Sequence, residues 1–157
     1  GWFGINKYSL LLIGQRQNNI GADRFINELR KNNGINILPR KSPLALMYNA
    51  LSENNILALA SDQDAKNSGI FVEFFGMKAS THKGAALFHL KSKAPIIFVT
   101  LHMESTNEYF LNIQPIITNK KSDIESITIS YTRLLENIII KHPEQYFWFH
   151  RRWKTKP

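Results

Sequence analysis

The first sixty residues alternate short apolar runs with segments in which apolar residues recur at helical spacing. Each apolar run is only a few residues long and ends near a turn residue or a proline, which is typical of buried strands. Between the runs, apolar side chains return every three or four residues, as on a helix that covers a core. The predicted strands are Tyr8 to Ile13, Ile35 to Leu38 and Ile56 to Ala60, and the predicted helices are Gly21 to Asn33 and Pro43 to Asn54.

The rest of the chain contains further strand and helix patterns after a polar loop at Ser61 to Gly69. Ser122 and Glu125 have the spacing of a capping box and precede a long apolar repeat that ends at Pro143. Glu144 to Trp153 is predicted to form one more short helix. The other predicted elements are an extended segment from Ile70 to Phe75, a helix from Ser80 or Thr81 to Ser92, and strands at Pro95 to Leu101 and Tyr109 to Ile113.

The order of these elements predicts an α/β fold with a mostly parallel or mixed central sheet flanked by helices. In such sheets ligands bind where the strands end at their carboxyl side. Two loops follow apolar strands and carry polar side chains, namely Gly14-Gln15-Arg16 and Ser61 to Asp64. We therefore expect ligand-binding or catalytic residues in these two loops.

Composition narrows the class of protein. The chain has 157 residues with 43% apolar content, which is enough for one domain with a real core, so we expect residues 1–157 to belong to a single domain. The absence of cysteine excludes disulfides, thiolate metal sites and a cysteine nucleophile. No stretch without a charged residue exceeds eleven residues, which is too short to span a bilayer.

Positive charge is concentrated at the end of the chain. The formal net charge is +8, and the segment His150 to Pro157 carries four cations and no acid. A basic cluster with interleaved aromatic residues fits nucleic acid, anionic lipid or a phosphorylated small molecule, and charge alone leaves these three open. The aromatic residues Tyr146, Phe149 and Trp153 have helical spacing, so we expect them to pack on the core.

The two candidate loops each allow two interpretations. Asp62-Gln63-Asp64 could bind a divalent ion, as the Asp-x-Asp of nucleotide-sugar glycosyltransferases does, or could simply stabilise a turn. Arg16 could bind a phosphate or a carbonyl oxygen through its guanidinium fork, or could be a solvated surface residue. The residue types alone do not decide between these interpretations.

Familiar catalytic motifs are absent from the sequence. None of the five histidines has Asp or Glu five residues later, so no His-x-x-x-x-[Asp/Glu] pair occurs. There is also no Gly-x-Ser-x-Gly elbow, no phosphate-binding Gly-Lys-Ser/Thr loop and no Gly-x-Gly-x-x-Gly fingerprint. The chain offers no recognisable nucleophile.

A set of motifs in a fixed order resembles the bacterial lipid A biosynthesis acyltransferases, the lauroyl and myristoyl transferases of the lysophospholipid acyltransferase superfamily. The motifs are Asp62-Gln63-Asp64, Gly69 to Gly76, Ala79-Ser80-Thr81 with Gly84, Pro143 to Tyr146, and His150 to Pro157. The resemblance implies a glycerol-phosphate-acyltransferase-like fold. It also implies transfer of a fatty acyl group from acyl carrier protein, or a related thioester, to a hydroxyl of a lipid A precursor or a similar glycolipid.

The family pattern also contains a His-x-x-x-x-[Asp/Glu] motif, in which the histidine is the general base and the acid orients it. This motif is missing here, and the resemblance places it just upstream of Gly1. We therefore expect the chain to be the carboxyl-terminal portion of a longer acyltransferase and to be inactive by itself, with the catalytic residues outside it. The glycosyltransferase and a non-enzymatic module that binds anionic lipid or nucleic acid are the alternative functions.

The resemblance assigns substrate-binding roles to six residues. Arg16 would stabilise the developing oxyanion or hold acceptor phosphate. Asp62 and Asp64 would be an acidic pair with a structural or orienting role, and the three cations Arg151, Arg152 and Lys154 would face lipid phosphates or the anionic membrane surface. The expected partners are acyl carrier protein, a phosphorylated glycolipid and the cytoplasmic face of the bacterial inner membrane. We expect no nucleic acid, metal or nucleotide cofactor.

Overall fold

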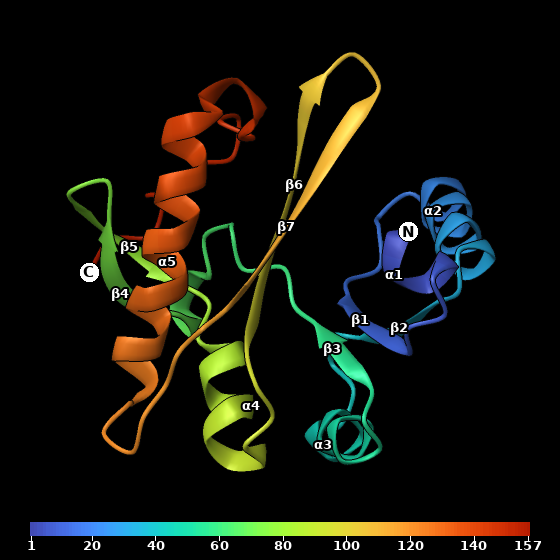
Figure 1. The fold of residues 1–157 in the computed structure, drawn as a ribbon, viewed down its shortest axis with the longest axis horizontal. Helices are drawn as coiled ribbons and strands as arrows, with labels where there is room; N and C mark the ends of the chain where they lie inside the picture. The colour runs from blue at the N-terminus through green and yellow to red at the C-terminus, as the bar shows by residue number, and fades with distance from the viewer. The chain divides into compact units, whose positions relative to one another are not determined.

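The computed structural model describes all residues from 1 to 157 and divides them into two compact units, residues 1–60 and 61–157. The elements of the two units run from blue to red in chain order (Figure 1). Helices and both parallel and antiparallel strands are present, which confirms the predicted α/β class. The grouping of residues 1–157 into a single domain stays a prediction.

The first unit is a three-stranded parallel sheet with helices in its connections. The strand order is β2-β1-β3, so β1 is central and hydrogen-bonds to both neighbours. The apolar runs and helical repeats of the sequence predicted these strands and the two longer helices to within a few residues. The strands are β1 (Leu10–Gly14), β2 (Ile35–Pro39) and β3 (Ile56–Ala58), and the helices are α1 (Trp2–Ile5), α2 (Ile20–Asn32) and α3 (Leu44–Ser52).

Local interactions explain where α2 begins and how the chain turns after its end. The side chain of Asn19 accepts a hydrogen bond from the backbone N–H of Ala22 at 3.0 Å and so caps the helix. After α2 the chain turns at Gly34, whose φ of +70° favours glycine. Gly4 of α1 lies against this turn so closely that a Cβ there would be 1.8 Å from the carbonyl oxygen of Asn33. Only glycine fits at this contact.

The second unit contains two antiparallel hairpins and two α-helices. A long α5 runs beside strands of both hairpins, as Figure 1 shows. None of the helices in either unit combines the length and the low polarity needed to cross a bilayer. The elements are η1 (Lys66–Ser68), β4 (Ile70–Phe74), β5 (Met77–Thr81), α4 (Gly84–Ser92), β6 (Ile97–Ser105), β7 (Glu108–Pro115), α5 (Ile124–Lys141) and η2 (Pro143–Gln145), where η denotes a short 3-10 helix.

The sequence patterns failed to predict β5. Phe75 and Gly76 have positive φ angles of 50° and 73°, so the chain reverses over two residues and β5 pairs with β4. Ser80 and Thr81 therefore belong to a strand, and the following helix begins only at Gly84, without a side-chain cap. The prediction that either residue starts this helix is wrong.

Two predictions around α5 are also corrected. Its capping box is formed by Asp123 and Ser126, one position after the predicted pair, because the side chain of Asp123 accepts from the backbone N–H of Ser126 and the Ser126 hydroxyl lies 3.0 Å from the N–H of Asp123. The predicted helix at Glu144 to Trp153 does not form. After η2 the chain continues in turns that end the helical hydrogen-bond pattern.

Two apolar clusters along α5 form the core of the second unit. Ile127 and Tyr131, from the first half of α5, pack with Ala86 and Ile116. Ile139, near its end, packs with β4 and β5 in a cluster that is completed by Tyr146 and Trp153. The last helix therefore joins the hairpin β4–β5 to the carboxyl-terminal segment.

Gln145 fixes the segment after α5 to the second hairpin. Its side-chain oxygen accepts a hydrogen bond from the backbone N–H of Met103 at 2.7 Å, and its side-chain nitrogen donates to the carbonyl oxygen of Met103 at 2.8 Å. The two bonds hold η2 against β6.

Candidate functional site

A hollow of about 540 Å³ lies in the first unit along β2 and α2 and reaches the carboxyl end of the parallel sheet. Its walls include the last residues of two neighbouring strands, Gly14 of β1 and Pro39 of β2, and one side of α2. This is where ligands bind in parallel sheets. The charged side chains that line it are Arg16, Asp23, Arg30 and Lys31.

Arg16 is held loosely at this hollow. Its side chain is 89% exposed, and its Nε lies 3.9 Å from a carboxylate oxygen of Asp23, which is too far for a hydrogen bond. Asp23 itself is fixed, because it accepts hydrogen bonds from the backbone N–H of Gln17 at 2.8 Å and the side-chain amide of Asn27 at 3.2 Å. The aspartate therefore lies near the arginine without occupying the guanidinium donors.

The charges around the hollow favour an anionic ligand. Three cations and one carboxylate line it, and the carboxylate is already bonded to two donors. A guanidinium with free donors can form two parallel hydrogen bonds to a phosphate or a carboxylate. The order of elements in the sequence singled out Arg16 but not Arg30 and Lys31, because the helical pattern of α2 indicated only a helix with a polar outer face.

In the second unit, the carboxyl-terminal segment holds the Asp62-Gln63-Asp64 loop in place. The backbone N–H of Asp64 donates to Nε2 of His150 at 2.8 Å, and the Thr155 hydroxyl donates to the buried carboxylate of Asp64 at 2.8 Å. The Tyr146 hydroxyl donates to the carbonyl oxygen of Asp62 at 3.2 Å. Asp64 thus stabilises a contact between segments that lie more than eighty residues apart.

Arg152 is buried in the same region, with only 1% of its surface exposed. It donates hydrogen bonds to the carbonyl oxygen of Ser80 at 2.7 Å and to the Thr81 hydroxyl at 2.6 Å. Its guanidinium carbon also lies 5.0 Å from the centre of the Phe74 ring. Burial lowers the pKa of Arg152, and the nearby groups Tyr146, Asp64 and Asp62 oppose that shift.

Comparisons with known proteins give the same family that the motifs of the sequence resemble. Residues 2–155 match the family described as bacterial lipid A biosynthesis acyltransferase. This chain belongs to that family. It is 31% identical to the lipid A biosynthesis lauroyltransferase of Escherichia coli (strain K12) over 133 residues, which cover 82% of this chain and 42% of the relative.

Two further relatives are acyltransferases with different names. The lipid A biosynthesis palmitoleoyltransferase of Escherichia coli (strain K12) is 30% identical over 69% of this chain and 36% of its own length. The phosphatidylinositol mannoside acyltransferase of Mycolicibacterium smegmatis is 22% identical over 83% of this chain and 43% of its own length. The chain thus spans about two fifths of the curated relatives that it matches.

Membership of the lipid A acyltransferase family favours acyl transfer over the glycosyltransferase interpretation of Asp62 and Asp64. The structure supplies a physical role for one of them, since one carboxylate oxygen of Asp64 already accepts the Thr155 hydroxyl inside the protein. Among the three cations expected at a headgroup, Arg151 and Lys154 are exposed, whereas Arg152 is bonded within the unit.

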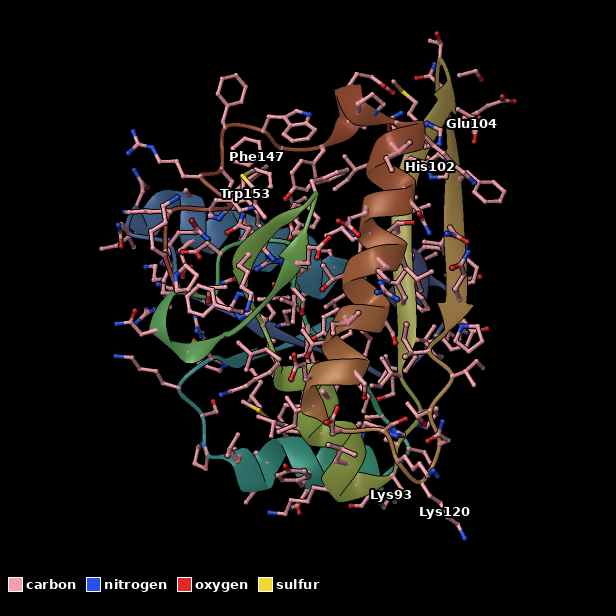
Figure 2. The ribbon with its side chains drawn as sticks, turned by 90° about the vertical axis from the view of Figure 1, so that its left-hand side faces the viewer. Lys93, His102, Glu104, Lys120, Phe147 and Trp153 are labelled. Atoms are coloured by element: carbon pink, nitrogen blue, oxygen red, sulfur yellow. The ribbon has the colours of Figure 1, made fainter.

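The three aromatic residues that were expected to pack on the core divide into two groups. Tyr146 and Trp153 pack on the β4–β5 hairpin as predicted, and Nε1 of Trp153 donates to the carbonyl oxygen of Phe74 at 3.3 Å. Trp153 is labelled in Figure 2. Phe149 is 91% exposed, so the prediction that it packs on the core is wrong. The reason is that this motif forms turns instead of the helix on which the spacing argument depended.

Proposed function

We propose that this chain forms the acceptor-binding part of a lipid acyltransferase. The reaction moves a fatty acyl group from acyl carrier protein, or a related thioester, to a hydroxyl of a lipid A precursor or a similar glycolipid. Family membership supports acyl transfer. The relatives are named as acyltransferases of lipid A biosynthesis and of phosphatidylinositol mannoside, and these names support a glycolipid as the acceptor.

In this reaction the acceptor oxygen attacks the thioester carbonyl carbon. A new C–O bond forms, the C–S bond breaks, and the hydroxyl proton passes by way of a general base to the departing sulfur. No histidine in residues 1–157 has an acid at the family spacing. These residues alone are therefore expected not to catalyse the transfer.

The observation that carries the proposal is the cationic hollow around Arg16. Negative charge develops on the thioester oxygen during the attack, and lipid A precursors carry phosphates, so either anion could be stabilised by a guanidinium with free donors. Arg30 and Lys31 line the same hollow and add to its positive potential.

The second unit would contribute to binding at the membrane. Arg151 and Lys154 are exposed and would face lipid phosphates or the anionic cytoplasmic surface of the inner membrane. Asp62, Asp64 and Arg152 would hold the loop and hairpin that support this surface. Acyl carrier protein, the phosphorylated glycolipid and the membrane are the proposed partners, and nucleic acid is not among them.

Substitution of Arg16 tests this proposal. In an acyltransferase that joins this chain to the catalytic His-x-x-x-x-[Asp/Glu] motif, Arg16→Ala should lower kcat/KM for transfer of a labelled acyl group from acyl carrier protein by about 100-fold, which is the usual loss when a donor to an oxyanion is removed. Arg16→Lys should retain part of the activity. Arg24→Ala is the matched control, because Arg24 is an exposed cation of α2 that does not line the hollow.

The result that would contradict the proposal is equal kcat/KM for Arg16→Ala and Arg24→Ala. Urea unfolding of both variants checks that a loss of activity does not come from a loss of folded protein. We expect both to unfold within about 0.5 kcal/mol of the original protein, since both side chains are exposed.

A further inference from the structure

Three side chains of residue types that can bind metals lie close together in the second unit, and none of them belongs to the candidate functional site. His102 and Glu104 lie on β6, and His142 directly follows the last residue of α5. One potential ligand atom from each of the three lies within 4.8 Å of the other two. Figure 2 shows His102 and Glu104 beside the carboxyl end of α5.

The backbone explains why these side chains converge. Glu104 lies where the pairing of β6 with β7 shifts register between Met103 and Ser105, and one of its carboxylate oxygens lies 2.8 Å from Nε2 of His102. The His142 ring stacks on the His102 ring with a centroid distance of 4.1 Å and an angle of 27°. The two hydrogen bonds between Gln145 and Met103 hold the strand and the segment with His142 together.

His102 is the most constrained member of the group. It is only 7% exposed, and its Nδ1 has no hydrogen-bond partner, although a buried ring nitrogen normally has one. One face of the ring is next to His142, and the Phe110 ring lies 5.3 Å away. The protein thus holds a buried imidazole against a carboxylate, through Nε2, and against a second imidazole, while its Nδ1 has no partner.

We propose that His102, Glu104 and His142 bind one divalent transition-metal ion of the Zn²⁺ type. A set of two imidazole nitrogens and one carboxylate oxygen binds Zn²⁺ in preference to Mg²⁺ or Ca²⁺, which take oxygen ligands. Three protein ligands leave a fourth coordination position for water. The Glu104 side chain is 54% exposed, so an ion can reach the group from solvent. The bound ion would connect the β6–β7 hairpin to the end of α5.

This site departs from the sequence expectation that no metal binds. His142 follows His102 by forty positions, and no short motif brings them together. The three residues come together only in the folded protein, where the hydrogen bonds of Gln145 hold η2 against β6. The proposal does not depend on acyl transfer, so it can fail or succeed independently of the proposed function.

Metal binding by the purified, untagged protein tests the proposal. Titration calorimetry with Zn²⁺ should show one saturable site per chain, and millimolar Mg²⁺ should not displace the ion. Co²⁺ should give visible absorption bands that disappear when Zn²⁺ is added. Saturating Zn²⁺ should also raise the Tm by several degrees, because an ion that binds only the folded protein stabilises it.

Two variants remove ligands, and two serve as controls. His142→Gln and Glu104→Gln should each weaken Zn²⁺ binding more than tenfold, since even the loss of a group that only supports a ligand costs 10- to 100-fold. Both positions have solvent access, so we expect the variants to fold, which circular dichroism checks. Glu108→Gln on the neighbouring strand and His89→Gln on α4 should bind Zn²⁺ as tightly as the original protein.

The proposal is overturned if no saturable binding occurs at one ion per chain. It is also overturned if His142→Gln and Glu104→Gln bind Zn²⁺ as tightly as the two controls, because the ion would then be held elsewhere.

Discussion

Two arginines, one in each unit, show how differently the same side chain is used. Arg16 is 89% exposed, and its nearest carboxylate oxygen lies beyond hydrogen-bond distance. Arg152 is almost completely buried, and both of its terminal nitrogens donate short hydrogen bonds to β5. The first guanidinium has donors to offer to a ligand, whereas the second uses its two terminal nitrogens to hold β5 in place.

The difference comes from what surrounds each residue. A buried guanidinium is stable only when polar groups and charges replace its hydration, and Ser80, Thr81 and the nearby Asp64 do so for Arg152. An exposed arginine beside a hollow keeps its water, which a phosphate can displace. A cluster of cations in a sequence therefore does not indicate how many of them can bind an anionic partner.

The largest effect on stability is expected at Arg152. Arg152→Ala leaves the carbonyl of Ser80 and the hydroxyl of Thr81 without their donor and should lower the free energy of unfolding by roughly 3 kcal/mol. Arg151→Ala, which removes an exposed cation next to it, should lower it by less than about 0.5 kcal/mol. Urea unfolding measures both values, and equal values would remove the distinction between buried and exposed arginines.

A smaller effect is expected for the exposed cations of the same segment. Each cation near an anionic bilayer contributes about 1 kcal/mol, so the double variant Arg151→Ala, Lys154→Ala should bind vesicles with anionic phospholipid roughly 10- to 30-fold more weakly at low salt. The matched control is Lys120→Ala, Lys121→Ala, which removes the same charge at the other end of α5 (Figure 2). A similar loss in both double variants would mean that only net charge matters.

The smallest effect concerns Asp123, a side chain that is exposed although one of its oxygens accepts two hydrogen bonds. Hydrogen bonds from the backbone N–H and hydroxyl of Ser126 lower the pKa of Asp123 below its ordinary value of 3.8. Its ionised form therefore stabilises the protein above pH 3.8, and this stabilisation disappears as the pH falls through the lower pKa of the folded state. The stability of Asp123→Asn relative to the original protein should thus be lower at pH 6, and the difference should shrink as the pH falls below 3.8, as measured by urea unfolding at each pH. A constant difference would contradict this account.

Periodicity predicted the strands and the two longer helices of the first unit, but not α1. The strands of this unit are short and apolar, and the apolar residues of α2 recur at helical spacing, so the local pattern and the secondary structure agree at Leu10–Gly14 and Ile20–Asn32. In the second unit, Met77–Thr81 shows what a local pattern misses. The positive φ angles at Phe75 and Gly76 turn the chain back onto β4, and pairing with that strand decides the structure of residues that resemble the start of a helix.

The candidate site residues were only partly predictable for a related reason. Arg16 stands directly after a strand, so its place at the sheet edge follows from the sequence order. The burial of Arg152 depends on β5, and the convergence of His102 with His142 depends on η2, and both contacts join residues far apart in the chain. No local pattern contains that information.

The bonds of Gln145 with Met103 have a consequence for solubility. The carboxamide offers the edge of β6 one acceptor and one donor, which are the groups that a neighbouring strand would present. That position is therefore already satisfied and cannot pair with a strand of another molecule. A single side chain thus protects this part of an apolar hairpin from aggregation.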